Sequence, residues 1–225
     1  MDSINSPQVQ GFQYKIGFSR EEFNKISGKE FGESEIENLL SKNGFEYKKV
    51  IVEEALRESI PICMDAVYKN PSAMRIDAPK AFSCSSLISY LYTEAGVWMP
   101  SLSVDKYIFG TLVSKEDLKF GDLVFSNTGN GKIWYKTVEW MEGTEVPEGV
   151  DHVGMYLGES KIIHATKKYG GVLVESLNDF DKTSKIVGWR RVADIKEERY
   201  VVNVPDNKAD LRKKEDLIGV LGVDK

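Results

Sequence analysis

The sequence contains little of what several large classes of protein depend on. It has two cysteines and two histidines in 225 residues, too few for a disulfide framework or for a zinc site with two histidines. No apolar run approaches the roughly 20 residues that cross a bilayer. The net charge of −5 argues against a general binder of nucleic acids or anionic membranes. We therefore expect no metal and no cofactor.

The amino terminus also lacks the features of an export signal. MDSINSPQVQGFQYK contains no basic segment followed by an apolar one, so it does not match a secretory signal peptide. With so few cysteines, a reducing cytoplasm is the compartment we expect. A chain of this length that is 41% hydrophobic can bury one sizeable core with a small second core beside it.

The first 50 residues predict two short helices. Ser19 is a candidate N-cap and Glu22 follows three residues later, which is the pattern of a capping box. The pattern recurs at Ser34 and Glu37, and Asn43-Gly44 is a left-handed stop for the second helix.

A third helical segment, residues 51–68, is predicted to break at Pro61 and resume, and a clearer helix begins at Cys84. The apolar residues of that helix recur with a period of 3.6 until Gly96 ends it. The tail predicts a strand, a loop with proline and a final helix closed by Gly222. Between helix and tail lie short alternating runs: KFGDLVFS, HVGMYLG, KIIHAT, GGVLVESL and KIVGWRRV. This order indicates an α+β fold in which the helix packs on one antiparallel sheet.

The cysteine that begins this helix is a candidate nucleophile. The free N–H groups at a helix N-terminus stabilise a thiolate, and a cysteine hydrolase also needs a base and a group that orients the base. If the strand hairpin turns at Glu159, positions whose numbers sum to about 318 face each other. His164 then faces Gly154, and His152 is its diagonal neighbour on the same face of the sheet. Gly154 leaves room for a ring between them.

Each of these residues also has an ordinary structural interpretation. A cysteine on an apolar helix is inert about nine times in ten, and a histidine on a strand is usually structural. The coincidence favours chemistry, because the two histidines of the chain fall on one hairpin at positions that can face Cys84. Cys63 has no such partners, and we expect it to be an inert core residue.

The order of these motifs resembles that of the NlpC-type cell-wall peptidases. AFSCSSLISYLY, LKFGDLVFS and DHVGMYLGESKIIHAT follow one another in the sequence. The family has the same order of a cysteine on a helix, a Gly-Asp-Leu strand, a His-Val-Gly strand and a second histidine after a short turn. The resemblance covers about residues 51–194.

The resemblance implies a papain-like fold and a set of site residues. Cys84 would be the nucleophile, His152 its base and His164 the group that orients the base. The oxyanion would be bound by the backbone N–H of Cys84 and by Tyr68. A packed aromatic without a role in the reaction is an equally good interpretation of Tyr68.

The chain departs from the family next to the cysteine. Where the family usually has Asp before the cysteine and Gly two positions after it, this chain has Ser83 and Ser86. In the family's peptidoglycan-fragment peptidases that Asp helps to bind the free amine of the substrate, and Ser83 carries no charge. Ser83 and Ser85 are candidates for contact with the oxyanion or the substrate. The thiol chemistry is implied more firmly than the cell-wall substrate.

A second departure is the long segment 127–150 before the histidine strand. Its aromatic residues Trp134, Tyr135 and Trp140 would line a substrate cleft if the segment were a lid. The alternative, which we favour slightly, is a surface hairpin that buries its own aromatics.

The two ends of the chain carry another resemblance. EEFNKISGKEFGESEIENLLSKNGFEY is similar to the opening of an accessory domain, the fifth B-type domain, in the beta chain of phenylalanyl-tRNA synthetase, and VVNVPDNKADLRKKEDLIGVLGVDK is similar to its end. The resemblance implies a small α/β satellite domain formed by residues 1–50 and 196–225, with the hydrolase domain, residues 51–195, inserted between its halves. No nucleotide-binding motif is present, so we do not expect a synthetase.

Together these features predict a cysteine hydrolase, a peptidase or amidase that cleaves an amide bond through a thioester. A peptidoglycan-type peptide is one candidate substrate. Two alternatives stay open. One is a non-catalytic module that binds RNA or protein, and the other is an enzyme that performs acyl transfer or thioester chemistry on a lipid or small amide. We expect a peptide or amide as the partner and no membrane; RNA contact would fall to the terminal domain, although its run 212–214 is more typical of a solvated helix face.

Overall fold

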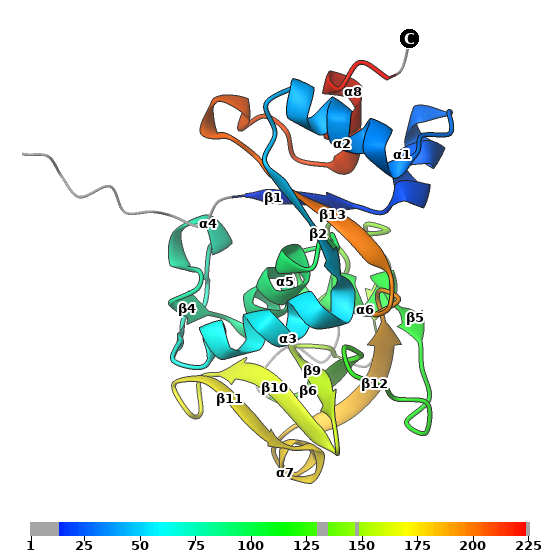
Figure 1. The fold of residues 1–225 in the computed structure, drawn as a ribbon. Helices are drawn as coiled ribbons and strands as arrows, with labels where there is room; N and C mark the ends of the chain where they lie inside the picture. The colour runs from blue at the N-terminus through cyan, green and yellow to red at the C-terminus, as the bar shows by residue number, and fades with distance from the viewer. Residues whose placement is uncertain (1–13, 130–134, 147–148, 224–225) are drawn as a thin grey trace, which may run out of the picture.

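The computed structural model describes residues 14–129, 135–146 and 149–223. Figure 1 shows two bodies: a small sheet under three helices, and a larger sheet with helices packed on one side. The helices are α1 (Arg20–Ser27), α2 (Glu33–Lys42), α3 (Val52–Cys63), α4 (Met74–Asp77), α5 (Cys84–Glu94), α6 (Ser103–Phe109), α7 (Leu177–Thr183) and α8 (Lys214–Val220), with a 3-10 turn at Asp206–Lys208. In these described ranges, the structure contains no helix long and apolar enough to cross a membrane.

Strands far apart in the sequence make up each sheet. The small sheet has the order β1-β13-β2 and the large one the order β4-β3-β11-β10-β9-β6-β12-β5, while β7 and β8 form a separate pair. Their bounds are β1 (Lys15–Phe18), β2 (Tyr47–Ile51), β3 (Val67–Tyr68), β4 (Ala81–Phe82), β5 (Thr111–Leu112), β6 (Leu123–Asn127), β7 (Tyr135–Lys136), β8 (Glu145–Val146), β9 (His152–Gly158), β10 (Lys161–Thr166), β11 (Gly171–Ser176), β12 (Lys185–Arg191) and β13 (Glu198–Asn203).

The two ends of the chain meet in the small sheet. β13 near the carboxyl end pairs on one side with β1 and on the other with β2, antiparallel in both cases. Helices α1, α2 and α8 cover this sheet (Figure 1), and apolar residues from both ends share one core, with Phe23, Leu40 and Leu217 fully buried in it. We call this body the terminal unit. The domain limits 50/51 and 195/196, and the resemblance to a synthetase domain, stay predictions.

The larger body has the α+β arrangement that the sequence predicts. Helix α5 packs on β9 and β10, and α3 packs on α5. The predicted alternation in β6 is confirmed, because Leu123 and Phe125 belong to the core beneath α5, whereas Val124 packs on the other face of the sheet. The sheet is antiparallel except where the short β3 runs parallel to β4.

The helix ends confirm one predicted cap and correct another. At α1, the Glu22 N–H donates to Ser19 Oγ over 3.3 Å, and the Ser19 N–H donates back to the Glu22 carboxylate. At α2 the prediction of Ser34 as the cap is wrong. The helix begins two residues earlier, because the Glu35 carboxylate accepts the N–H of Gly32 over 2.8 Å. The helix then ends as predicted before a left-handed glycine at residue 44.

The predicted break at Pro61 is also wrong. Helix α3 continues through Pro61 to Cys63. A proline removes one backbone donor, and here the loss falls in the last turn. The predicted second helical stretch is instead β3, which contains Tyr68. Helix α7, which the sequence analysis missed, begins after Ser176, whose hydroxyl accepts the N–H of Asp179 over 3.1 Å.

The terminal unit rests directly on the end of α5. A Cβ on Gly17 of β1 would lie 2.0 Å from the carbonyl oxygen of Gly96. Arg199 of β13 donates from Nε to the same oxygen over 2.8 Å, and Lys15 forms an ion pair with Glu94. The contact therefore has no room for a side chain at residue 17.

Replacing Gly17 by alanine tests this contact. Because the added methyl group would overlap backbone atoms, we expect Gly17→Ala to lower the free energy of unfolding by about 2 kcal/mol or more. Gly32→Ala is the control, since its Cβ meets nothing nearer than 3.4 Å, and it should cost about 1 kcal/mol or less. Urea unfolding measures both. An unchanged midpoint for Gly17→Ala would contradict the packing.

Candidate active site

Cys84 is the first residue of α5 and is almost buried, with 9% of its surface exposed. Ser83 is the N-cap of this helix and accepts the N–H of Ser86 over 3.2 Å. The Cys84 sulfur receives hydrogen bonds from the backbone N–H groups of Val153 and Ser85. Since Val153 directly follows His152 at the start of β9, the sulfur lies beside the first peptide of the histidine strand.

The histidine hairpin has the predicted register. Ile163 faces Met155 and Ile162 faces Tyr156, so both pairs sum to 318. A Cβ on Gly154 would lie 3.1 Å from the Ile163 carbonyl oxygen and 3.3 Å from the His164 Cβ, so a side chain at this position would press against His164.

The two imidazoles contact each other directly. His152 Nε2 lies 2.8 Å from His164 Nδ1, and the rings meet edge to face at 80°. Because the Nε2 of His152 is engaged with His164, its Nδ1 is the ring nitrogen left to exchange a proton with a thiol.

Phe180 of α7 covers the histidine pair. Its ring stacks on His152 at 5.7 Å between centroids and meets His164 edge to face at 5.1 Å. His152 and His164 are consequently buried. Burial in turn lowers the pKa of His152 to about 4 and that of His164 to about 3, so both rings are neutral at pH 7.

Burial also raises the pKa of the Cys84 thiol. The two backbone donors and the Lys106 cation oppose this rise, while Asp151 adds to it. The N–H groups at the helix N-terminus thus lower the pKa of the thiol, in the direction expected from the sequence, but desolvation outweighs them. The resting site holds a thiol and a neutral imidazole.

Lys106 is a charged residue near the cysteine that the sequence analysis missed. It lies on α6, is fully buried, and donates to Ser85 Oγ, Pro100 O and Ser101 O over 2.7–2.9 Å. Burial lowers its pKa to about 7, and the Cys84 charge opposes that shift. In the sequence it belongs to a short, weakly patterned segment, SVDKYIF, where a lysine is usually exposed.

The other predicted residues lie close to the cysteine in different roles. Tyr68 is partly buried on β3. Burial and then the Cys84 charge raise its pKa, while a hydrogen bond with Asn70 lowers it. The Ser83 side chain caps α5. The Ser85 hydroxyl is bonded to Ser101 O and accepts from Lys106. Neither serine hydroxyl is free of partners within the protein.

The segment 127–150 is fastened to the body of the protein where it is described. Asp105 Oδ1 accepts the N–H groups of Val138, Glu139 and Trp140 over 2.8–2.9 Å. Trp140 packs against Phe109 and Trp98 and stays partly exposed. Trp134 and the side chain of Tyr135 lie outside the described residues, so the choice between lid and hairpin is not decided for them, although β7 and β8 pair as a hairpin.

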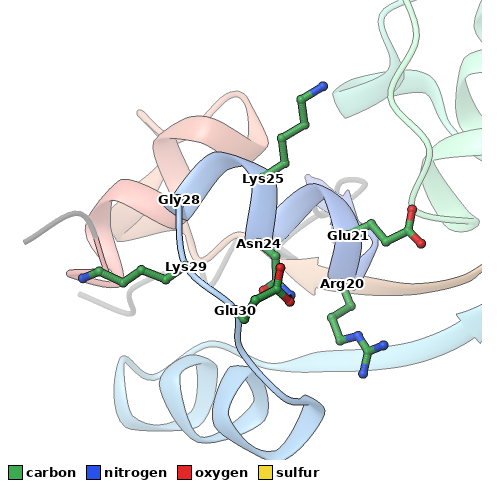
Figure 2. Close-up of a pocket in the computed structure, with 7 residues that line it drawn as sticks. All are labelled: Arg20, Glu21, Asn24, Lys25, Gly28, Lys29 and Glu30. Carbon is green, nitrogen blue, oxygen red and sulfur yellow. The ribbon is translucent and has the colours of Figure 1, made fainter.

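The hollow in Figure 2 lies on α1 and the turn after it, lined by Arg20, Glu21, Asn24, Lys25, Gly28, Lys29 and Glu30. It belongs to the terminal unit and includes no thiol or imidazole. Within the part of the chain that the structure describes, no group of three His, Cys, Asp or Glu side chains could hold a metal ion.

The site thus contains a cysteine at a helix N-terminus, bonded to the backbone of the residue after His152, and a buried histidine pair on an antiparallel sheet. The sequence model of the NlpC/P60 family matches residues 73–139, a range that includes the cysteine and ends before the histidines. Residues 73–139 are therefore similar to the NlpC/P60 family.

Curated relatives agree with this family. The chain is 30% identical over 118 residues to a gamma-DL-glutamyl hydrolase of Bacillus subtilis, covering 52% of this chain and 25% of that protein. It is 31% identical over 101 residues to a probable endopeptidase of Haemophilus influenzae, covering 44% of this chain and 52% of that protein. It spans about a fifth of the length of the similar p60 endopeptidase of Listeria seeligeri, with 18% covered.

Solved structures of the same family resemble the chain more distantly. An NlpC/P60 family protein from Bacillus cereus aligns with a TM-score of 0.49 and 24% identity, covering 63% of this chain and 40% of that one. NlpC1 from Trichomonas vaginalis aligns with a TM-score of 0.49 and 21% identity, covering 63% and 44%.

Replacing Lys106 by methionine tests the buried cation. Because the Lys106 charge lowers the pKa of Cys84, removing it should raise that pKa further. The ultraviolet absorbance of the thiolate, titrated against pH with Cys84→Ala as the blank, measures this. Cys63 does not interfere, because burial raises its pKa to about 12. Lys115→Met, on the surface, is the control and should leave the titration unchanged. An unchanged pKa in Lys106→Met would contradict the role.

The buried histidines also predict acid sensitivity. Their folded pKa values lie below the ordinary value of 6.5, so the unfolded chain binds protons first as pH falls. Stability should be complete above about pH 6.5 and decline towards pH 4, by on the order of 3 kcal/mol for His152 alone. Urea midpoints at pH 7.5 and 5 measure the loss. His152→Gln/His164→Gln should lose less between these pH values than the wild type; an equal loss would contradict the prediction.

Proposed function

We propose that the chain is a cysteine hydrolase that cleaves a peptide-type amide bond, with Cys84 as nucleophile, His152 as base and His164 orienting the base. One observation carries the proposal. The Cys84 sulfur accepts the N–H of Val153, next to His152, while His152 Nε2 is engaged with His164. This leaves one imidazole nitrogen, Nδ1, to serve a thiol beside it.

The reaction follows from the neutral resting pair. As the Cys84 sulfur attacks the carbonyl carbon, its proton passes to Nδ1 of His152. His152 then gives that proton to the leaving amine as the C–N bond breaks, and a thioester remains. Water attacks the thioester, His152 takes a proton from the water, and the acid product leaves as the proton returns to the sulfur.

The tetrahedral oxyanion needs donors that are already in place. The N–H of Cys84 at the start of α5 is one, as the family resemblance implies, and the Tyr68 hydroxyl is the second. Support for Tyr68 is its electrostatic contact with Cys84.

The substrate we propose is a γ-glutamyl peptide of the peptidoglycan type. Support comes from the names of relatives, a gamma-DL-glutamyl hydrolase and the peptidoglycan endopeptidase RipB of Mycobacterium tuberculosis. Ser83 supplies no negative charge where the family has Asp, so we propose that a free amino terminus on the substrate is not required.

The terminal unit has a separate proposed origin. We infer that it is an accessory domain interrupted by the hydrolase domain. The pairing of β13 with both β1 and β2 supports this. The small sheet needs strands from both ends of the chain, so neither end can form it alone.

Hydrolysis of synthetic peptides tests the proposal. A γ-glutamyl peptide with a free amino terminus and its N-acetylated form should be cleaved at rates within about fivefold of each other. Residue 83 has no charge to attract the amine, and an exposed contact elsewhere would contribute at most about that factor. Cys84→Ala should abolish cleavage and His152→Ala should slow it by about 100-fold or more. Mass spectrometry of the products measures both. Cleavage that survives Cys84→Ala would contradict the proposal, and no cleavage at all would favour a binding module.

Ser83→Asp is the matched variant for specificity. Aspartate is as good an N-cap as serine, so α5 should keep its start. The added charge should increase the preference for the free amine about tenfold, measured as a ratio of the two peptides so that effects on Cys84 itself cancel. An unchanged ratio would show that residue 83 does not face the substrate's amine.

A further inference from the structure

Two buried polar atoms behind the histidine pair face each other. His164 Nε2 on β10 and Glu175 Oε1 on β11 lie 2.8 Å apart, with side chains 5% and 10% exposed. Their approach is close but not aligned as a hydrogen bond, and neither atom has another hydrogen-bond partner among the described residues. Burying an unpaired donor or acceptor is costly, so each of these atoms needs the other.

The neighbouring strands bring the carboxylate there. In the β10–β11 pairing, His164 faces Leu173 and Ile162 faces Glu175. Glu175 is therefore a diagonal neighbour of His164 on the same face, which is the relation that His152 has to His164 on the other side. The side chains of His152, His164 and Glu175 therefore follow one another in a row.

The hydrogen bond between the histidines admits two tautomers. When both rings are neutral, one nitrogen of the pair must carry the proton and the other must accept it. If His152 donates from Nε2, its Nδ1 is an unprotonated base, and His164 carries its proton on Nε2. If His164 donates from Nδ1, His152 carries its proton on Nδ1 and cannot accept one from a thiol.

We propose that Glu175 is a positioning residue that holds His152 in the tautomer able to accept the Cys84 proton. An ionised carboxylate has only acceptor atoms, so it stabilises the state in which His164 Nε2 is protonated. That state makes His164 Nδ1 an acceptor and makes His152 the donor. The inference rests on the proposed function, because it explains how the base is kept ready.

Protonation of Glu175 would reverse the preference. A carboxylic acid can donate to His164 Nε2, which favours the tautomer with a blocked His152. The groups that bear on Glu175 are His164 beside it, His152 beyond that ring, Lys168 in the β10–β11 turn and Asp179 on α7. Burial and Asp179 raise the pKa of Glu175, while Lys168 lowers it. The base-ready state is therefore present at pH above that pKa and is lost as pH falls through it.

The chain allows a direct measurement, because it contains two histidines and hence four imidazole nitrogens. Nitrogen-15 chemical shifts of the labelled protein distinguish protonated from unprotonated ring nitrogens, and His164→Gln assigns the signals. At neutral pH we expect the wild type to be protonated at Nε2 of both rings and unprotonated at both Nδ1 atoms. Protonation of His164 at Nδ1, whether alone or together with Nε2, would overturn the proposal.

Glu175→Gln tests the cause. The amide presents both a donor and an acceptor, so it no longer selects one tautomer, and the ring signals should move towards intermediate values. With a cleaved peptide, kcat should fall about 10- to 100-fold with little change in KM. Glu159→Gln, in the exposed hairpin turn, is the control and should change neither. Ring signals that stay at wild-type positions in Glu175→Gln would overturn the proposal.

The outcomes separate this inference from the proposed function. The expected tautomers without any cleaved peptide would leave the positioning role standing and count against the hydrolase. Cleavage that requires Cys84 and His152 but is unchanged in Glu175→Gln would support the hydrolase and contradict the positioning role of Glu175. If the variant fails to fold, the wild type alone suffices: lowering the pH should shift the His164 signals as Glu175 titrates, and constant signals down to the unfolding transition would contradict the proposal.

Discussion

The site depends on the pairing of β9 with β10 and on where α5 begins against it. The register that sets Ile163 opposite Met155 places His152 and His164 on one face, with Gly154 leaving space for their rings. A slip of one residue would turn one histidine to the other face of the sheet. The backbone N–H of Val153 reaches the cysteine sulfur, so the same strand positions base and nucleophile.

Burial governs the chemistry of this arrangement. Covered by Phe180, the histidines are neutral at pH 7, and the cysteine remains a thiol. Cys84 and His152 are therefore a thiol and a neutral base in the resting protein and not a preformed ion pair. The tautomer of His152 determines whether it can accept the thiol proton. Positive charge near the sulfur comes from Lys106, which is itself buried and whose pKa burial lowers to about 7, so this charge titrates near neutral pH.

Much of the fold and of the candidate site could be predicted from the sequence. The features that could not be predicted depend on tertiary packing. Alternation of apolar residues and a short turn were enough to predict the pairing of His164 with Gly154, because register follows from them. Glu175 and Lys106 were missed because a charged residue in a short segment is ordinarily exposed, and only the packing of β11 and α6 buries them. The raised pKa of Cys84 was not predicted, since a sequence shows the helix N-terminus but not the depth of burial.

The most direct test of the account is the rate at which iodoacetamide alkylates Cys84 at neutral pH, followed by peptide mass mapping with Cys63 as the internal reference. If His152 takes the proton of Cys84, this sulfur should react at least about tenfold faster than that of Cys63, and His152→Ala should slow the reaction of Cys84 while that of Cys63 stays the same. Equal rates for the two cysteines, or a Cys84 rate that His152→Ala leaves unchanged, would contradict it.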